Sequence, residues 1–200
     1  MTWPTHFDRT LSDEENRLLT SIGIANRRIF ETSQSTRSLA GMGTTVVGAH
    51  FSIKKKRMFV GHVGDSRAYR IREGEIQQLT RDHSLVNEPF PELSEAERAE
   101  LPKNVITRAL GMRDTVQVDI KPHQIFDGDI YLMCSDGLSD MLDDQSISQV
   151  LQMYDSLSAA GQALIDAAND AGGKDNIAVV LARVPGPAAP AARSWWPFRR

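Results

Sequence analysis

The chain has 200 residues, of which 40% are apolar, and its formal net charge is −3. This size and composition fit one globular domain with a shared core, and the slightly negative charge gives no electrostatic basis for nucleic-acid binding. The single cysteine, Cys134, cannot form an internal disulfide, and neither a signal-peptide pattern nor an apolar stretch of about 20 residues is present. We therefore expect a cytoplasmic protein without nucleic-acid partners.

The first predicted element is a helix over residues 13–34. Ser12 and Glu15 have the spacing of a capping box, and apolar residues follow at helical intervals. The basic run at 54–57 predicts a solvated turn between two strands. Four segments rich in β-branched and apolar residues predict consecutive antiparallel strands over residues 44–53, 58–63, 68–71 and 76–79.

Residues 82–104 interrupt this pattern with polar and proline-containing sequence, which we interpret as an inserted flap. Ser94 and Glu97 repeat the capping-box spacing and predict a short helix inside the flap. Strands are then predicted over residues 116–120 and 130–134, and the unbroken apolar character of the second indicates burial on both faces.

Two helices are predicted next, one beginning near Asp143 and one over residues 157–171, followed by a strand over 177–184. Antiparallel strands followed by helices, without regular alternation, indicate an α+β layered fold. We assign residues 1–184 to this domain.

Residues 185–200 are rich in proline and alanine and end in an aromatic and basic segment. The composition favours an extended linker with a disordered end. The alternative is that Trp195, Trp196 and Phe198, beside two arginines, dock on a membrane surface or a partner protein.

Three aspartates lie next to predicted strand ends. Asp65 and Asp136 each follow a strand, Asp175 precedes the last strand, and each has a glycine within two residues. Carboxylates in such positions can converge and hold a hard cation such as Mg²⁺ or Mn²⁺. Each Gly-Asp or Asp-Gly pair taken alone is also a common turn signal, so spacing alone leaves both interpretations open.

Five sequence motifs occur together and in one order: Val-Gly-Asp-Ser-Arg-Ala at 63–68, Thr-Arg-Asp-His-Ser at 80–84, Ile-Thr-Arg-Ala-Leu-Gly at 106–111, Cys-Ser-Asp-Gly-Leu-Ser-Asp at 134–140 and Lys-Asp-Asn-Ile at 174–177. This series resembles the type 2C, metal-dependent protein serine/threonine phosphatase family, specifically its compact bacterial members. The segment Gly-Met-Gly-Thr-Thr at 41–45 also matches the family's start of a central strand. The resemblance extends over residues 13–184.

The resemblance implies a four-layer αββα sandwich of two antiparallel sheets flanked by helices. It implies that Asp136 and Asp175 are ligands of two catalytic Mn²⁺ or Mg²⁺ ions, and that Asp65 and Asp136 hold a third, looser ion. The implied reaction is hydrolysis of phosphoserine and phosphothreonine in proteins by a metal-activated water. Implied substrates are proteins phosphorylated by a serine/threonine kinase.

Three further residues in these motifs have alternative roles. Guanidinium groups suit phosphate, so Arg67 and Arg108 could bind substrate, but the sequence favours an ion pair near the metal-binding turn for Arg67 and a place at the flap base for Arg108. His83 could donate a proton, since histidine titrates near neutral pH. Its motif favours a role as an anchor of a turn or of the flap.

The amino-terminal motifs of the family find no counterpart between Met1 and Leu39. These motifs are a phosphate-binding Arg, an Asn-Glu-Asp segment, and an Asp-Gly-Met-Gly-Gly segment whose Asp bridges both catalytic metals. We therefore expect a sandwich that lacks its first strands and leaves sheet edges open to pairing with another chain. Three accounts stay open: a truncated chain, strands supplied by a separate polypeptide, or a catalytically incomplete domain that acts as a regulatory binding module.

Cys134 does not fit a cysteine phosphatase, which needs an Arg six residues after its nucleophile. Asp140 occupies that position. We therefore predict that Cys134 is a buried strand residue.

Overall fold

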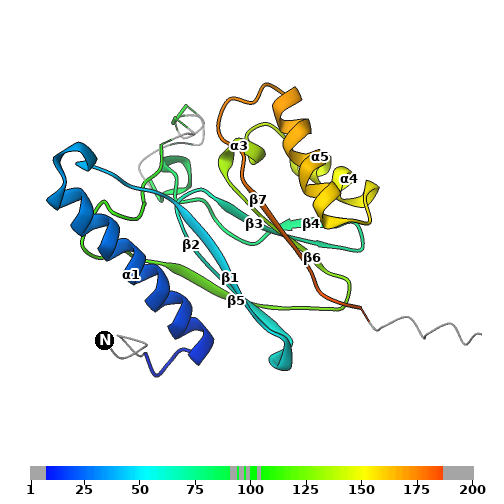
Figure 1. The fold of residues 1–200 in the computed structure, drawn as a ribbon, viewed down its shortest axis with the longest axis horizontal. Coiled ribbons are helices and arrows are strands. Elements are labelled where there is room, and N and C mark those ends of the chain that lie inside the picture. Colours follow the sequence, from blue (N-terminus) through cyan, green and yellow to red (C-terminus); the bar gives the residue numbers. More distant parts are fainter. Residues whose placement is uncertain (1–7, 91–93, 95–96, 98–99, 103–104, 187–200) are drawn as a thin grey trace, which may run out of the picture.

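A computed structural model of the chain describes residues 8–90, 94, 97, 100–102 and 105–186. They form two antiparallel sheets packed face to face, with helix α1 outside one sheet and helices α4 and α5 outside the other (Figure 1). The four layers confirm the predicted α+β sandwich architecture. Within the described residues, no helix is long and apolar enough to cross a membrane.

Helix α1 spans Asp13–Ser35, in agreement with the predicted helix. The Ser12 hydroxyl accepts a hydrogen bond from the Glu15 backbone N–H, and the Glu15 carboxylate accepts one from the Ser12 N–H. This capping box gives hydrogen-bond partners to backbone N–H groups that would otherwise have none at the start of the helix. One face of the helix packs on the first sheet through Leu18, Ile22 and neighbouring apolar residues.

The first sheet has three strands in the order β1-β2-β5, and their bounds are Val46–Ser52, Arg57–Val63 and Asp119–Gln124. The predicted turn at the basic run is confirmed: a short 3-10 helix, Ile53–Lys55, joins β1 to β2 and ends at Lys56 with a φ of 49°.

The predicted strand over residues 116–120 is wrong in its bounds. The ladder between β5 and β2 begins at Asp119 and runs to Gln124. Val116 and Val118 instead pack against α1 and its neighbours, so their apolar character reflects burial under a helix rather than strand pairing.

The second sheet has four strands in the order β4-β3-β6-β7, with bounds Glu75–Gln78, Arg67–Arg72, Ile130–Cys134 and Val179–Arg183. Glu73 and Gly74 both have positive φ, 51° and 85°, which is the geometry of a tight two-residue hairpin turn between β3 and β4. The four early strands are consecutive in the chain, as predicted, but β2 and β3 belong to different sheets and do not pair with each other.

The helices outside the second sheet are α4, Asp144–Met153, and α5, Leu157–Asp170. Asp143 caps α4, which therefore begins where the sequence predicts, and the Ser156 side chain caps α5. A short helix α3, Asp136–Ser139, directly follows β6 and was not predicted. Further 3-10 turns lie at Arg37–Leu39 and Leu85–Asn87.

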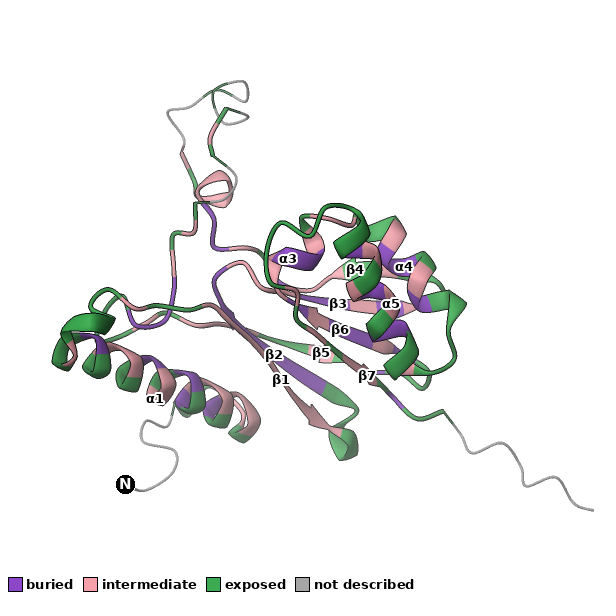
Figure 2. Ribbon diagram, turned by 45° about the horizontal axis from the view of Figure 1, so that its top comes forward, coloured by how far each residue is buried: buried purple, intermediate pink, exposed green. Residues whose placement is uncertain are grey.

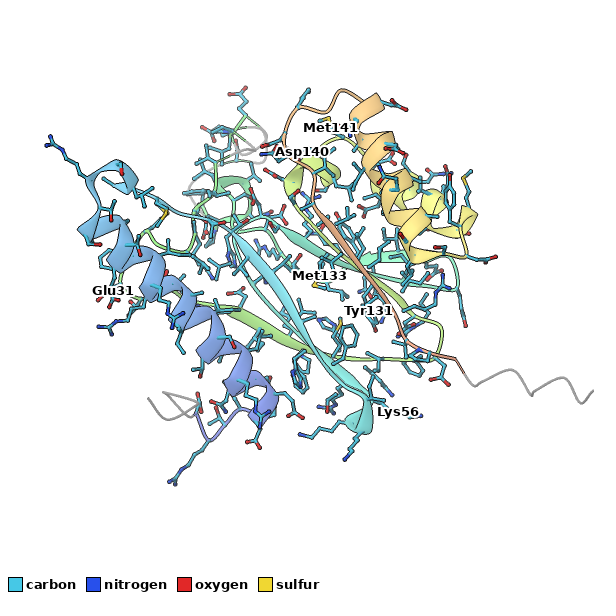
Figure 3. The ribbon with its side chains drawn as sticks, viewed as in Figure 1. Glu31, Lys56, Tyr131, Met133, Asp140 and Met141 are labelled. Atoms are coloured by element: carbon cyan, nitrogen blue, oxygen red, sulfur yellow. The ribbon has the colours of Figure 1, made fainter. Side chains whose placement is uncertain are left out.

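Apolar side chains fill three interfaces between the four layers, and Figure 2 shows buried residues concentrated on the inner strands and on the inward faces of the helices. Successive side chains of strand β6 point alternately into two of these interfaces. Leu132 packs toward α4 and α5, whereas Tyr131 and Met133 lie between the sheets (Figure 3). The prediction that β6 is buried on both faces is confirmed.

The flap region is described only in part. The hydrogen bonds of the Ser94–Glu97 capping box are present. The remainder of the short helix predicted there lies outside the described residues, and so do residues 187–200 of the predicted tail.

Candidate metal centre

Asp65 lies in the turn where the chain passes from β2 in the first sheet to β3 in the second. Gly64 has a φ of +106°, and a side chain there would come within 2.3 Å of the Thr45 side chain. On the other side of Asp65, the hydroxyls of Ser66 and Thr45 are 2.8 Å apart. The residues that flank Asp65 are therefore held tightly against the start of β1.

Asp136 and Asp175 lie on two segments that touch. Asp136 begins α3 at the end of β6, and a Cβ on Gly137 would be 2.4 Å from the backbone oxygen of Asn176. The Ser135 hydroxyl donates to the same Asn176 oxygen at 3.0 Å and accepts from the Ala178 N–H at 3.0 Å. These contacts fix the segment that carries Asp175 beside the one that carries Asp136.

Both carboxylates are also held locally. One Asp136 oxygen accepts the Gly137 N–H at 2.9 Å, and one Asp175 oxygen accepts the Asn176 N–H at 2.6 Å. A carboxylate has further lone pairs, so each keeps acceptor capacity for a cation.

A cavity of about 290 Å³ opens where the Asp65 turn meets α3. Among the described residues, four carboxylates line it: Asp65, Asp82, Asp136 and Asp140. Asp175 is exposed and does not belong to this lining. The cavity therefore unites two of the three predicted ligands, while the third lies on the adjoining segment.

Asp140 is a site residue that the sequence analysis missed. It lies directly after α3, four residues beyond Asp136, at the same end of the sandwich (Figure 3). Residues four apart share one face of a helical turn, so the Asp-x-x-x-Asp spacing was the signal that could have identified it.

Electrostatics in the cavity favour a bound cation. Burial raises the pKa of Asp65, and the negative charges of Asp136, Asp82 and Asp140 raise it further. The Ser139 hydroxyl, which also lines the cavity, is buried and has no hydrogen-bond partner among the described residues. A set of oxygen donors with mutually repelling charges fits a hard divalent cation such as Mg²⁺ or Mn²⁺.

Arg67 lines the cavity, but its guanidinium group is engaged by Asp82. Its Nη2 lies 2.7 Å from Asp82 Oδ2, its Nε contacts both Asp82 oxygens, and its Nη1 donates to the Tyr69 hydroxyl. The geometry is an ion pair at the cavity wall.

His83 is a buried residue behind the Asp65 turn. Its Nδ1 accepts the Gly64 N–H at 3.0 Å, and its backbone N–H donates to the Gly64 oxygen at 2.9 Å. Burial lowers the His83 pKa, as do His62 and Arg108, and these effects outweigh the opposing effect of Asp119. His83 thus faces the turn as a neutral acceptor and does not line the cavity.

Arg108 does not line the cavity that Asp65, Asp136 and Asp140 share. It donates to Asp119 at 2.7 Å and to the backbone oxygen of Gln117 at 3.3 Å. Nearby, Ile106 pairs with Ser84 across the two ends of the flap. Arg108 therefore ties the flap base to β5.

His62, His83 and Asp119 also place three ligand-type groups close together. The two imidazole rings stack with centroids 4.6 Å apart and planes 18° apart, and the His62 Nε2 contacts the Arg81 backbone oxygen at 2.8 Å. A ring nitrogen binds metal in the plane of its ring, so two nearly parallel rings cannot direct their lone pairs at one ion. We interpret this trio as packing.

Cys134 is buried in β6, as predicted. Burial is the main reason that its thiol pKa is raised to about 12. The thiolate that a cysteine nucleophile needs is therefore strongly disfavoured.

Comparison with known proteins agrees with this geometry. The family described as Protein phosphatase 2C matches residues 6–98. The serine/threonine phosphatase stp of Listeria welshimeri is 38% identical over 177 residues, which cover 86% of this chain and 69% of the relative.

Two solved structures show the same fold. The serine/threonine phosphatase of S. agalactiae matches with a TM-score of 0.77 and 40% identity, over 87% of this chain and 72% of that one. The catalytic domain of the phosphatase PstP, in complex with two manganese ions, matches with a TM-score of 0.75 and 33% identity, over 89% and 74% of the two chains. The chain belongs to the protein phosphatase 2C family of serine/threonine phosphatases.

Proposed function

We propose that this chain hydrolyses phosphoserine and phosphothreonine in proteins, with Mn²⁺ or Mg²⁺ held by the acidic cluster as cofactor. The observation that carries the proposal is the convergence of Asp65, Asp136 and Asp140 on one cavity, where their charges raise the pKa of Asp65. Membership in the phosphatase 2C family supports it, and so does the similar phosphatase in complex with two manganese ions.

In this proposal, Asp136 and Asp175 hold the two catalytic ions, and Asp65, Asp136 and Asp140 hold a third. When bound, the ions supply a water of lowered pKa and neutralise charge on the phosphoryl oxygens. The chain itself positions the donors: the Gly64 turn holds Asp65, and the Gly137 contact sets Asp136 beside Asp175. Arg67, tied to Asp82, forms one wall of the cavity.

Substrates in this proposal are proteins phosphorylated on serine or threonine by a serine/threonine kinase, in a cytoplasmic setting. We assign the activity to a domain over residues 1–184, with residues 185–200 as a separate tail. The flap contributes Ser84, Val86 and Asn87 to the cavity wall. Substrate residues on either side of the phosphorylated side chain would therefore contact the flap.

One observation favours an alternative function. Arg67 is the only cationic residue among the described residues that line the cavity, and Asp82 already neutralises it. The described part of the cavity wall thus offers no free cation to bind the substrate phosphate. The alternative is a catalytically incomplete or degenerate phosphatase domain that acts as a regulatory binding module.

Hydrolysis of a phosphothreonine peptide, with and without Mn²⁺, distinguishes the two functions. We expect Mn²⁺-dependent release of phosphate by the 200-residue chain. In Asp136→Asn we expect a loss of at least about 100-fold, because a ligand of the proposed catalytic ions is gone.

The matched control is Asp170→Asn, an exposed carboxylate at the end of α5, which should keep full activity. If the folded chain gives no Mn²⁺-dependent turnover, the proposed phosphatase activity is rejected and the binding-module alternative is supported.

A further inference from the structure

Asp82 differs from the other carboxylates that line the metal cavity, because its oxygens already have hydrogen-bond donors. Its Oδ1 accepts from Arg67 Nε at 3.1 Å and from Gln78 Nε2 at 3.0 Å. Its Oδ2 accepts from Arg67 Nε at 3.0 Å and from Arg67 Nη2 at 2.7 Å. A carboxylate offers about four acceptor positions, and these bonds use all of them. Asp82 therefore lies in the cavity wall without an oxygen free to bind a cation.

The ion pair between Arg67 and Asp82 joins the Asp65 turn to the chain segment that leads into the flap. Arg67 comes two residues after Asp65 and is the first residue of β3. Asp82 comes one residue before His83, which holds Gly64 through two hydrogen bonds. The chain on both sides of Asp65 is thus tied to two consecutive residues of one segment.

The same segment forms one half of the flap base. The His83 backbone oxygen accepts a hydrogen bond from the Thr107 N–H at 2.8 Å. The Asn87 side-chain amide donates to the Asp82 backbone oxygen at 3.0 Å and to the Ser84 hydroxyl at 3.1 Å. Ser84 and Asn87 both line the metal cavity. A displacement of this segment would therefore move the Asp65 turn and the flap side of the cavity together.

We propose that the Arg67–Asp82 pair is a positioning device that couples cation binding at the Asp65 turn to the conformation of the flap base. Neither residue is a ligand in this inference, because Asp82 has no free acceptor position and Arg67 carries the same sign of charge as the cation. A cation bound by Asp65 fixes the turn, and the pair holds the flap side of the cavity in the matching position. Coupling is reciprocal, so a flap held in place strengthens cation binding by the same factor. The inference rests on the proposed metal-dependent function.

The variant Arg67→Gln separates positioning from a simple effect of charge. If Arg67 acted through its charge alone, its removal would take a cation from the cavity wall, leave Asp82 without its counter-ion and strengthen Mn²⁺ binding. Positioning predicts the opposite. The dissociation constant for Mn²⁺, measured by calorimetric titration, should rise at least about fivefold, because the Asp65 turn loses its connection to Asp82.

The matched control is Arg72→Gln, at the other end of β3. Arg72 forms an ion pair with Asp129 at 2.7 Å, the same distance as between Arg67 and Asp82, and the two arginine side chains are 28% and 25% exposed. The Arg72 pair does not line the metal cavity. Arg72→Gln should therefore lose stability in urea unfolding but bind Mn²⁺ as tightly as the wild type.

Hydrogen exchange in the wild-type chain tests the coupling without any substitution. Addition of Mn²⁺ should slow exchange of the Leu85 and Thr107 amides, whose hydrogen bonds close the flap base. The Lys56 amide, in the turn between β1 and β2, should exchange at the same rate with and without Mn²⁺.

The outcomes distinguish this inference from the proposed function. If the wild type binds Mn²⁺ and a folded Arg67→Gln variant binds it equally or more tightly, the coupling alone is overturned. Flap-base amides whose exchange does not respond to bound Mn²⁺ would overturn it as well. A wild-type chain that binds no Mn²⁺ would overturn the metal centre itself, and the coupling with it.

Discussion

His83 shows how a single buried side chain sets the position of the candidate metal site. Its Nδ1 and its backbone N–H both bond to Gly64, the residue before Asp65. Its ring stacks on His62, and its Nε2 lies 3.4 Å from Asp119, which Arg108 also engages. A chain of contacts thus connects the Asp65 turn to β5 and the flap base.

Replacing His83 should change both the stability and its dependence on pH. In His83→Phe the buried Gly64 N–H loses its acceptor, so urea unfolding at pH 7.5 should show a loss of about 2 kcal/mol. The lowered His83 pKa means that the unfolded chain binds the proton more tightly. The wild type therefore has this stability above pH 6.5 and loses it as the pH falls through the folded-state pKa.

The control is His83→Asn, whose amide oxygen can replace Nδ1 as acceptor but does not titrate. It should lose less stability than His83→Phe at pH 7.5, and both variants should lose less than the wild type between pH 7.5 and 5.5. Equal pH dependence in all three proteins would show that His83 does not contribute to it.

At the residue scale, sequence motifs identified Asp65, Asp136 and Asp175 as candidates. The motifs could not show which other side chains lie around them. Asp140 was missed because its role depends on α3, a four-residue helix too short to give a periodic signal. The engagement of Arg67 by Asp82 and of Arg108 by Asp119 depends on which strands are neighbours. Local sequence does not contain that information.

Among the elements, α3 and the segment that leads into β7 depend on one close contact. Gly137 has no side chain, and this allows the backbone oxygen of Asn176 to approach its Cα. The Ser135 hydroxyl closes the same contact from the other side. The separation of Asp136 from Asp175 therefore depends on the size of residue 137.

Gly137→Ala should separate the two segments. The added Cβ would lie 2.4 Å from the Asn176 oxygen, so we expect a loss of about 1–3 kcal/mol in urea unfolding. The shift should also weaken Mn²⁺ binding, because Asp136 and Asp175 move apart.

The control is Gly23→Ala in α1, where an added Cβ meets nothing within 4 Å. Alanine favours a helix over glycine, so this variant should gain about 0.5–1 kcal/mol and bind Mn²⁺ unchanged. A Gly137→Ala variant with wild-type stability and metal affinity would contradict the role of this contact.

Elements were predictable where local signals were strong. The capping box fixed the start of α1, and apolar continuity identified β6 within its observed bounds. Strand β5 was misplaced because its paired residues include Lys121 and Pro122, which do not resemble a buried strand, whereas the apolar Val116 and Val118 pack under α1. Only the ladder with β2 decides where β5 begins.

Across the whole molecule, two sheets and two helical layers place the acidic turns at one end of the sandwich. The resemblance to the phosphatase family gave this architecture, but the assignment of β2 and β3 to different sheets follows from tertiary packing around the Asp65 turn. That crossing brings Asp65, at the end of the first sheet, to α3 at the end of the second.

The central claim is that these acidic turns form a divalent-cation centre, and calorimetric titration of Mn²⁺ into the metal-free 200-residue chain tests it most directly. We predict saturable binding in the wild type and in Asp170→Asn, and at least about tenfold weaker binding in Asp136→Asn, because carboxylates are the ligands that such cations prefer. The absence of binding by the folded chain, or equal affinity in Asp136→Asn and the wild type, would contradict the account.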